Sequence, residues 1–353
     1  MFLRNSTKVI HVGNVKIGGG NPIIVQSMTN TKTMDVPATV AQIKQLEAAG
    51  CELVRVAVPN LTTANVLPDI KKQINIPLVA DIHFDYKIAI ESIKNGADAI
   101  RINPGNIGGY NCVKAVAEVA KQYQVPIRVG VNAGSLDAKI LEKHGGVNAE
   151  ALAESAVVNV RMLEDCDFDN IVVSVKASNI NLMTDASQLL AQHLYYPQHI
   201  GLTEAGTPYK GAIRSSVALG ILLKQGLGDT IRVSISGDPV EEIKVAKEIL
   251  QSLGLRKFGI TIIACPTCGR TDINVIELAD RLEMFLENNP KPLTIAVMGC
   301  SVNGPGEARE ADLGIAGGKG NAVLFRKGKI IRKVNEDDLF HTLLEEIDRY
   351  EIQ

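Results

Sequence analysis

The chain has 353 residues, of which 46% are hydrophobic and 22% charged, and its net charge is −2. This length suits a barrel of about 250 residues followed by a smaller module. The composition is typical of a globular protein, and the near-neutral charge excludes a general attraction to nucleic acid or to acidic membranes.

The N-terminal segment, MFLRNSTKVIHVGNVKIGGG, has no continuous apolar run of the signal-peptide type, and no later stretch is long and apolar enough for a membrane span. We therefore expect a cytoplasmic protein. In that compartment the six cysteines are interpreted as free thiols or metal ligands rather than as disulfides. Residues 6–22 predict a hairpin with Gly13 and Asn14 at its turn, ahead of the main fold.

From about residue 22 to residue 240, short β-branched segments alternate with helical stretches rich in Ala, Leu, Glu and Lys. The predicted strands are residues 22–28, 52–58, 77–82, 99–103, 126–132, 171–178, 199–204 and 230–236. Eight such units predict an α/β fold, an N-terminal (β/α)8 TIM-type barrel over residues 1–253. A doubly wound parallel sheet is the alternative.

The pattern changes near Leu255. Strands are predicted over residues 258–265 and 292–300, with a helix over 271–288 between them. A further strand, a hairpin and a final helix follow. Residues 254–353 are therefore predicted to form a small C-terminal α+β domain.

Five of the predicted barrel strands carry a cation between apolar neighbours. These cations are Arg55, Arg101, Arg128, Lys176 and Arg232, and steps of two along the strands lead to Asn103, Asn132, Ser174 and Ser234. Asp81 and His83 share a face of their strand, and Glu204 is expected at the end of the seventh strand.

Such cations either point outward into the helix layer, form internal ion pairs, or line a binding pocket. Several unpaired cations inside a barrel would each cost several kcal/mol, roughly, and too few acids lie in the same strands to neutralise them. Arginine binds phosphate oxygens in pairs. The pattern thus predicts a pocket for a phosphorylated small molecule at the carboxyl end of the barrel.

Three cysteines lie in Gly- and Pro-rich segments of the C-terminal domain, Cys265 and Cys268 in CPTCGR and Cys300 in GCSVNGPGE. A structural zinc site would need a fourth ligand, and no histidine lies near these segments. A thioredoxin-like dithiol would leave Cys300 without a role. An iron–sulfur cluster is the third interpretation, with Glu307 as a carboxylate ligand that exchanges more readily than a thiolate. Cys51, Cys112 and Cys166 are interpreted as structural thiols.

These residues resemble a known family. The motifs are MTNT at 28–31, ADIHF at 80–84, RINPGN at 101–106, VGVNAGSL at 129–136, SVKAS at 174–178, HIGLTEAG at 199–206, CPTCGR at 265–270 and GCSVNGPGEA at 299–308. Together they resemble the bacterial 4-hydroxy-3-methylbut-2-enyl diphosphate synthases of the non-mevalonate isoprenoid pathway.

The resemblance implies an iron–sulfur oxidoreductase that opens 2-C-methyl-D-erythritol 2,4-cyclodiphosphate, with electrons from flavodoxin or ferredoxin. It implies a [4Fe-4S] cluster on Cys265, Cys268, Cys300 and Glu307, and a head-to-tail homodimer. The implied substrate-binding residues are Arg55, Asp81, His83, Arg101, Asn103, Arg128, Asn132, Ser174, Lys176, Arg232 and Ser234. Glu204 is our candidate for the proton donor, with His83 as a second candidate or as a histidine bonded to Asp81.

Three other functions remain open from the residues alone. One is a zinc-stabilised phosphate-binding barrel without redox chemistry. Another is an aldolase or isomerase with Lys176 as a Schiff-base lysine. The last is a radical enzyme using S-adenosylmethionine, but the chain lacks a CxxxCxxC motif near the first strand.

Overall fold

The computed structural model describes residues 2–287, 289–300, 306 and 308–351. The chain forms two compact units, Met1–Arg256 and Lys257–Gln353, and each is described by itself. The sequence pattern predicts this boundary three residues earlier, between residues 253 and 254.

The first unit is built around a parallel sheet of eight strands in the order β8-β7-β6-β5-β4-β3-β10-β9. A parallel bridge between Val173 in β8 and Gln198, just before β9, joins the two ends of this order. The sheet therefore closes into the predicted barrel, and the doubly wound alternative is wrong. The strands are β3 (Ile24–Met28), β4 (Leu53–Ala57), β5 (Leu78–Asp81), β6 (Ala99–Ile102), β7 (Ile127–Asn132), β8 (Ile171–Lys176), β9 (His199–Ile200) and β10 (Thr230–Ile231).

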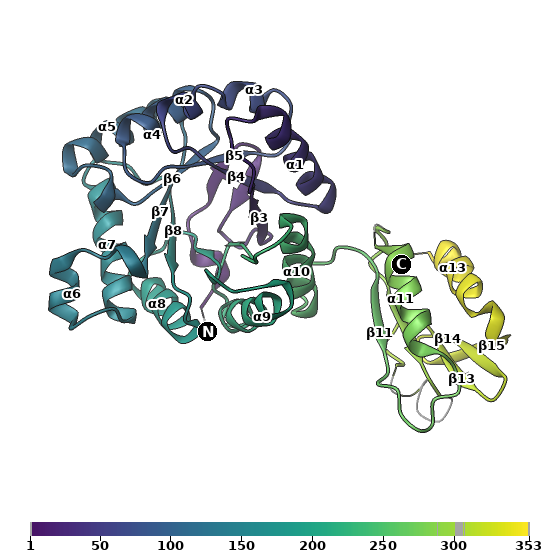
Figure 1. The fold of residues 1–353 in the computed structure, drawn as a ribbon. Helices are drawn as coiled ribbons and strands as arrows, with labels where there is room; N and C mark the ends of the chain where they lie inside the picture. The colour runs from purple at the N-terminus through teal and green to yellow at the C-terminus, as the bar shows by residue number, and fades with distance from the viewer. Residues whose placement is uncertain (1, 288, 301–305, 307, 352–353) are drawn as a thin grey trace. The chain divides into compact units, whose positions relative to one another are not determined.

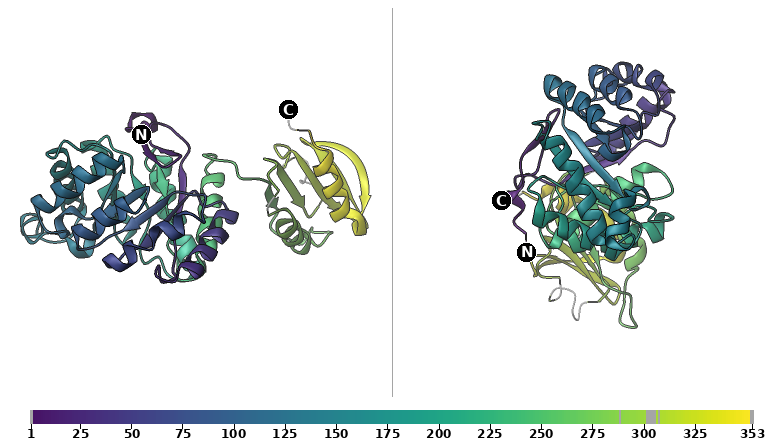
Figure 2. Two further views of the ribbon diagram at one scale, coloured as in Figure 1. Left: turned by 90° about the horizontal axis from the view of Figure 1, so that it is seen from above. Right: turned by 90° about the vertical axis from the view of Figure 1, so that its left-hand side faces the viewer.

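Helices surround these strands on the outside (Figures 1 and 2). Several begin at a side chain that accepts a backbone N–H, such as Asp35, Asn148 and Asp238. The first ends at Gly50, whose φ of 97° suits a residue without a side chain. The longer helices are α1 (Val36–Ala49), α4 (Tyr86–Lys94), α5 (Tyr110–Tyr123), α7 (Ala149–Glu164), α8 (Ile180–His193), α9 (Pro208–Lys224) and α10 (Pro239–Ser252), and the short ones are α2 (Leu61–Ala64), α3 (Leu67–Lys71) and α6 (Ala138–His144).

The predicted N-terminal hairpin is present as β1 (Ile10–Val12) and β2 (Val15–Ile17), joined at Gly13 and Asn14. Val12 and Ile17 of the hairpin pack against apolar side chains of β3 to β6. Those side chains are Ile24, Leu53, Val79 and Ala99. The hairpin thus covers the amino-terminal end of the barrel with apolar groups, and the carboxyl end, where TIM-barrel sites lie, carries the polar side chains.

Two barrel strands are shorter than the sequence predicts, because β9 ends at Ile200 and β10 at Ile231. Beyond β9 and β10 the two segments of the chain still lie close together, since a Cβ at Gly201 would be 2.5 Å from the carbonyl oxygen of Arg232. The expectation that Glu204 ends the seventh strand is wrong. Glu204 lies in the loop before α9, with a left-handed φ of 55°.

The second unit has a five-stranded mixed sheet in the order β11-β12-β13-β14-β15, in which β11 to β13 are parallel and the rest antiparallel. The strands are β11 (Thr261–Ala264), β12 (Thr294–Met298), β13 (Leu313–Gly318), β14 (Asn321–Arg326) and β15 (Lys329–Asn335). Helices α11 (Val275–Leu286) and α13 (Leu339–Arg349) share one apolar core with this sheet, which confirms the predicted α+β domain (Figure 1). A second apolar cluster joins Met298 and Phe325 to Ala308 and Ala311.

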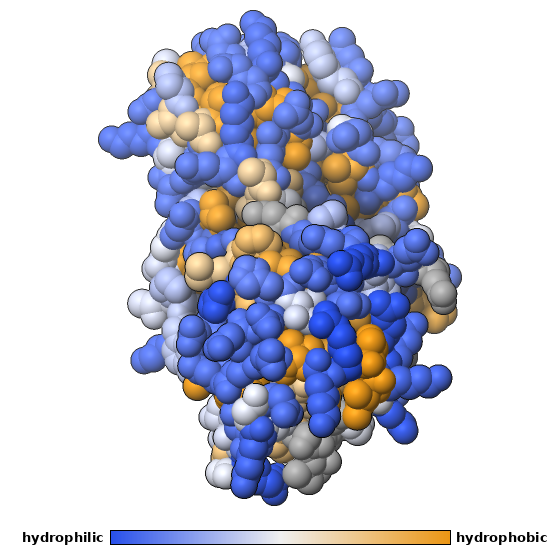
Figure 3. Space-filling model, turned by 90° about the vertical axis from the view of Figure 1, so that its right-hand side faces the viewer, coloured by the Kyte–Doolittle hydropathy of each residue, from blue (hydrophilic) through white to orange (hydrophobic). Residues whose placement is uncertain are grey.

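Within the described ranges, every helix is too short or too polar to cross a bilayer. Figure 3 shows one face on which hydrophobic side chains form separate patches among hydrophilic ones. Exposed apolar residues of the second unit include Ile276, Met284 and Phe285 on α11 and Ile330 on β15. Single exposed apolar residues of this kind are ordinary on a protein surface.

Candidate active site

Five basic side chains from five strands or strand ends gather inside the barrel, towards its carboxyl end. We call them the cation cluster. Its members are Arg55 on β4, Arg101 on β6, Arg128 on β7, Lys176 on β8 and Arg232 just after β10. Arg55, Arg101 and Arg128 are only 4%, 3% and 5% exposed. Arg55 and Arg101 follow the interior residues Leu53 and Ala99 by steps of two, and Arg128 lines the same interior space as Leu53 and Ala99. All three therefore face the barrel axis and not the helix layer.

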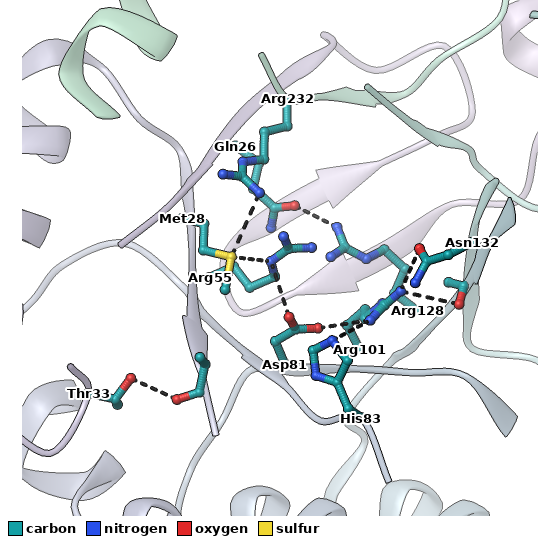
Figure 4. A network of polar contacts seen from close by, with 12 residues as sticks. Gln26, Met28, Thr33, Arg55, Asp81, His83, Arg101, Arg128, Asn132 and Arg232 are labelled. Carbon is teal, nitrogen blue, oxygen red and sulfur yellow. Dashed lines mark hydrogen bonds and ion pairs between the residues drawn. The ribbon is translucent and has the colours of Figure 1, made fainter. Parts of the chain in front are cut away.

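Asp81, at the end of β5, lies between two of these arginines (Figure 4). Its Oδ1 is 3.4 Å from Nη1 of Arg101, and its Oδ2 is 3.9 Å from Nε of Arg55. Burial would raise the pKa of Asp81, but Arg55, Arg101 and Arg128 outweigh burial and lower it to about 2. Asp81 is therefore a carboxylate at any physiological pH, and it neutralises one charge of the cluster.

Arg101 is held by groups from neighbouring strands. Its Nη2 donates to the carbonyl oxygen of Gly130 at 3.3 Å and to Oδ1 of Asn132 at 3.2 Å. Its Nη1 is 3.5 Å from Nε2 of His83 (Figure 4). His83, an exposed residue, thus contacts Arg101 where the sequence suggested a bond to Asp81.

Arg128 is the most poorly neutralised arginine of the cluster. Its Nη1 donates to Oε1 of Gln26 at 2.6 Å, while its buried Nε and Nη2 have no protein partner. Burial lowers the pKa of Arg128, and the nearby Arg55 and Arg101 lower it further. Burial and the same arginines also lower the pKa of Lys176 well below its ordinary value.

Arg232 pairs with Glu242 of α10, a residue that the sequence patterns did not single out. Its Nε lies 3.4 Å from Oε2 of Glu242, and its Nη2 lies 3.4 Å from Oε1. Ser27 and the backbone of Ile235 also donate to this carboxylate. Gln26 was missed as well, although it lies two residues before Met28 on the interior face of β3, so alternation along the strand could have found it.

The arginine side chains also meet at Met28. The Nε of Arg55 is 3.1 Å from its Sδ, and Nη1 of Arg232 is 3.7 Å away. Burial lowers the pKa of Arg55 to about 10, despite the opposing effect of Asp81. Even so, Arg55 keeps its charge at neutral pH.

Charge balance is the main electrostatic feature of this site. Among the described residues, the acids paired with the cation cluster are Asp81 and Glu242, which leaves five basic side chains, four of them arginines, against two carboxylates. Buried N–H groups without a protein partner include Nη1 of Arg55 and Nε of Arg101. Such groups are costly unless a ligand satisfies them. A small polyanion with several oxygen acceptors would supply both the charge and the hydrogen bonds.

The other predicted pocket residues take varied positions. Asn103 is buried, and its Oδ1 accepts the Gly105 N–H at 3.3 Å, which shapes the turn after β6. Ser174 is buried and its Oγ has no partner, whereas Ser234 is half-buried two residues after Arg232. Glu204 is exposed in its loop.

In the second unit, the cysteine segments follow the carboxyl ends of the adjacent parallel strands β11 and β12. The N–H of Gly299, next to Cys300, donates to Sγ of Cys265 at 3.0 Å. The N–H of Asp272 donates to the Gly299 carbonyl at 2.8 Å, which ties the loop after Cys268 to the same segment. Cys265 and Cys300 are half-buried and Cys268 is exposed.

The structure brings these loops together without joining the thiols. Among the described residues, no three His, Cys, Asp or Glu side chains converge as a metal site. Glu307 lies outside the described residues. The donors still suit a metal–sulfur group chemically, because thiolate sulfurs of such centres accept backbone N–H bonds as Cys265 does here.

The fold and the site define a class: a TIM-barrel protein with a cationic interior suited to a polyanionic ligand, and with an added α+β unit that presents cysteine loops. Two family models match this chain, the GcpE TIM-barrel domain over residues 7–247 and the GcpE protein C-terminal domain over residues 261–349. The chain therefore belongs to the GcpE family, the 4-hydroxy-3-methylbut-2-en-1-yl diphosphate synthases, and the resemblance predicted from its motifs is confirmed.

Similar proteins include the 4-hydroxy-3-methylbut-2-en-1-yl diphosphate synthase (flavodoxin) of Ruminiclostridium cellulolyticum, 56% identical over 344 residues, which are 98% of each chain. The enzyme of the same name from Caldanaerobacter subterraneus is 56% identical over 347 residues, again 98% of each chain. Both relatives thus match this chain through both units.

Two solved structures support the barrel fold alone. The sialic acid synthetase of Leptospira borgpetersenii has a TM-score of 0.52 at 14% identity, covering 70% of this chain and 90% of its own. The dihydropteroate synthase of Stenotrophomonas maltophilia has a TM-score of 0.51 at 13% identity, covering 70% and 98%.

Proposed function

We propose that this chain converts 2-C-methyl-D-erythritol 2,4-cyclodiphosphate to 4-hydroxy-3-methylbut-2-enyl diphosphate and water. The reaction consumes two electrons and two protons and breaks carbon–oxygen bonds. Its family supports this activity. The observation that carries it is the excess of buried cations over carboxylates inside the barrel, which suits a cyclic diphosphate.

The diphosphate binds the cation cluster. Arg55, Arg101 and Arg128 each hold at least one buried N–H without a protein partner, and these donors are available to phosphate oxygens. Lys176, at the end of β8, adds a flexible amine whose protonated form pairs with a phosphate. Asp81 and Glu242 keep the arginines oriented while the site is empty, so little reorganisation is needed on binding.

The second unit holds a [4Fe-4S] cluster through Cys265, Cys268, Cys300 and Glu307. When bound, such a cluster supplies single electrons and a Lewis-acidic iron. The Gly299 N–H stabilises negative charge on the Cys265 sulfur. Glu307, as a carboxylate among thiolates, is the ligand that exchanges most readily.

Glu204 supplies a proton or stabilises charge at the departing oxygen. Support for this role comes from its position at the carboxyl end of the barrel and from its left-handed backbone, since strained residues cluster at functional sites. His83 is the alternative proton donor. Its contact with Arg101 favours a supporting role in the cation cluster instead.

Electrons come from flavodoxin, which the names of the relatives include, or from ferredoxin. We further propose a head-to-tail homodimer in which the barrel of one subunit meets the cluster-bearing unit of the other. A cytoplasmic location stays a prediction.

The test is anaerobic reconstitution with iron and sulfide, followed by turnover with the cyclic diphosphate and reduced flavodoxin. We expect about four irons and matching sulfide per chain and an EPR signal on reduction that changes with substrate. One zinc per chain and no sulfide would favour the phosphate-binding barrel. Borohydride trapping at Lys176 would favour the Schiff-base alternative.

A further inference from the structure

A single arginine on α9 ties together two loops at the carboxyl end of the barrel. Nη2 of Arg214 donates to the Ser178 carbonyl at 2.9 Å, and Nη1 donates to the Ala205 carbonyl at 3.1 Å. Nη1 also lies 3.4 Å from the carbonyl oxygen of Glu204. A guanidinium group is suited to this, because its rigid, planar donors can reach two segments at once.

The two loops carry candidate site residues. Ser178 follows Lys176, the last residue of β8, by two positions. The loops also meet directly, since the Thr203 N–H donates to the Ala177 carbonyl at 3.3 Å. On the other side, the Ser236 N–H donates to the Gly206 carbonyl at 2.9 Å. The backbone around Glu204 is therefore held by the segments that follow both neighbouring strands, β8 and β10.

This restraint coincides with an unfavourable backbone conformation. Glu204 has φ 55°, a region that non-glycine residues rarely adopt, and Gly206 two residues later has φ 113°. A glutamate keeps such a conformation only where its surroundings impose it. The Arg214 contacts to this backbone supply part of that restraint.

We propose that Arg214 is a positioning residue that fixes Glu204 relative to Lys176 at the mouth of the barrel. The proposal rests on the proposed function, in which both side chains act on the cyclic diphosphate. Arg214 itself does not touch the substrate and acts through the backbone of residues 178, 204 and 205.

The test compares Arg214→Met with Arg214→Lys in the reconstituted holoenzyme. Loss of the donors in Arg214→Met lowers kcat about tenfold to hundredfold, as a misplaced catalytic group does, while KM for the cyclic diphosphate changes little. Arg214→Lys keeps a cationic donor that can reach one of the two loops, and it restores part of kcat. Lys224→Met, at the exposed end of the same helix, is the matched control with unchanged kinetics.

A double-mutant cycle separates positioning from a general structural role. If Arg214 acts through Glu204, adding Arg214→Met to Glu204→Gln causes no further loss of kcat. Losses that multiply overturn the proposal, and so does an Arg214→Met enzyme with wild-type kcat.

Amide hydrogen exchange tests the restraint without turnover. In Arg214→Met, peptides spanning residues 176–180 and 199–207 exchange faster, while those of α5 do not. An unchanged exchange rate in both peptides overturns the proposal. Absence of turnover in the wild-type holoenzyme would instead count against the proposed function, and the exchange result would still decide the role of Arg214.

Discussion

Arg101 lies directly across the backbone of Gly130, its neighbour on β7. A Cβ built at Gly130 would be 2.3 Å from Nε of Arg101 and 2.8 Å from Nη2. The absence of a side chain at this position leaves the space in which the guanidinium reaches Asp81 and Asn132. The cation cluster therefore depends on a glycine as much as on its charged residues.

Gly130→Ala should displace Arg101 and weaken its contacts with Asp81. Overpacking of this kind destabilises a protein by about 1–3 kcal/mol. We expect a lower melting temperature and a raised KM for the cyclic diphosphate, measured by thermal denaturation and steady-state kinetics. Gly134→Ala is the control, because a Cβ there meets nothing within 4 Å. Equal stability and KM in the two variants would contradict the steric account.

Arg128→Met should improve stability while impairing binding. Arg128 is buried with two nitrogens unpartnered, so replacing it with an apolar side chain removes an uncompensated charge, and we expect a gain of about 1 kcal/mol or more in the ligand-free protein. Wild type should gain melting temperature in inorganic pyrophosphate, because ligand binding stabilises the folded state, and the variant should not. A variant that is less stable than wild type yet responds normally to pyrophosphate would show that Arg128 has a structural role.

Asp81 should make stability depend on acid pH. Its pKa is about 2 in the folded protein, below the value near 3.9 in an unfolded chain. The stabilisation is thus complete above about pH 4, and roughly 2–3 kcal/mol is lost as the pH falls towards 2. Urea unfolding of wild type and Asp81→Asn at several pH values tests this. We expect the variant to be less stable at pH 7, because Arg55 and Arg101 lose their partner, and to show a shallower decline below pH 4. Parallel declines would rule out a depressed pKa.

The sequence predicted some parts of the site better than others, for physical reasons. Strand alternation is strictly periodic, so Arg55, Arg101 and Arg128 could be assigned to one face without a structure. Glu242 could not, because it lies on helix α10 and its contact with Arg232, just after β10, is a tertiary contact that no local pattern marks. Glu204 was found as a residue but misplaced, because β9 ends at Ile200 and no local sequence pattern marks the left-handed backbone at Glu204.

Differential reactivity of the six cysteines would test the assignment of the metal ligands. Burial raises the pKa of the Cys51 thiol to about 12, so Cys51 should resist iodoacetamide in every state. Cys268 is exposed and should be alkylated rapidly in the metal-free protein. Anaerobic reconstitution should protect three thiols together, those of Cys265, Cys268 and Cys300. The half-buried Cys112 and Cys166 should keep their original reactivity and serve as internal references.

Cys300→Ser should lose iron, sulfide and turnover, whereas Cys51→Ala should retain the metal and lose only stability. If mass spectrometry finds Cys268 as reactive after reconstitution as before, the thiols of the second unit do not hold the cluster.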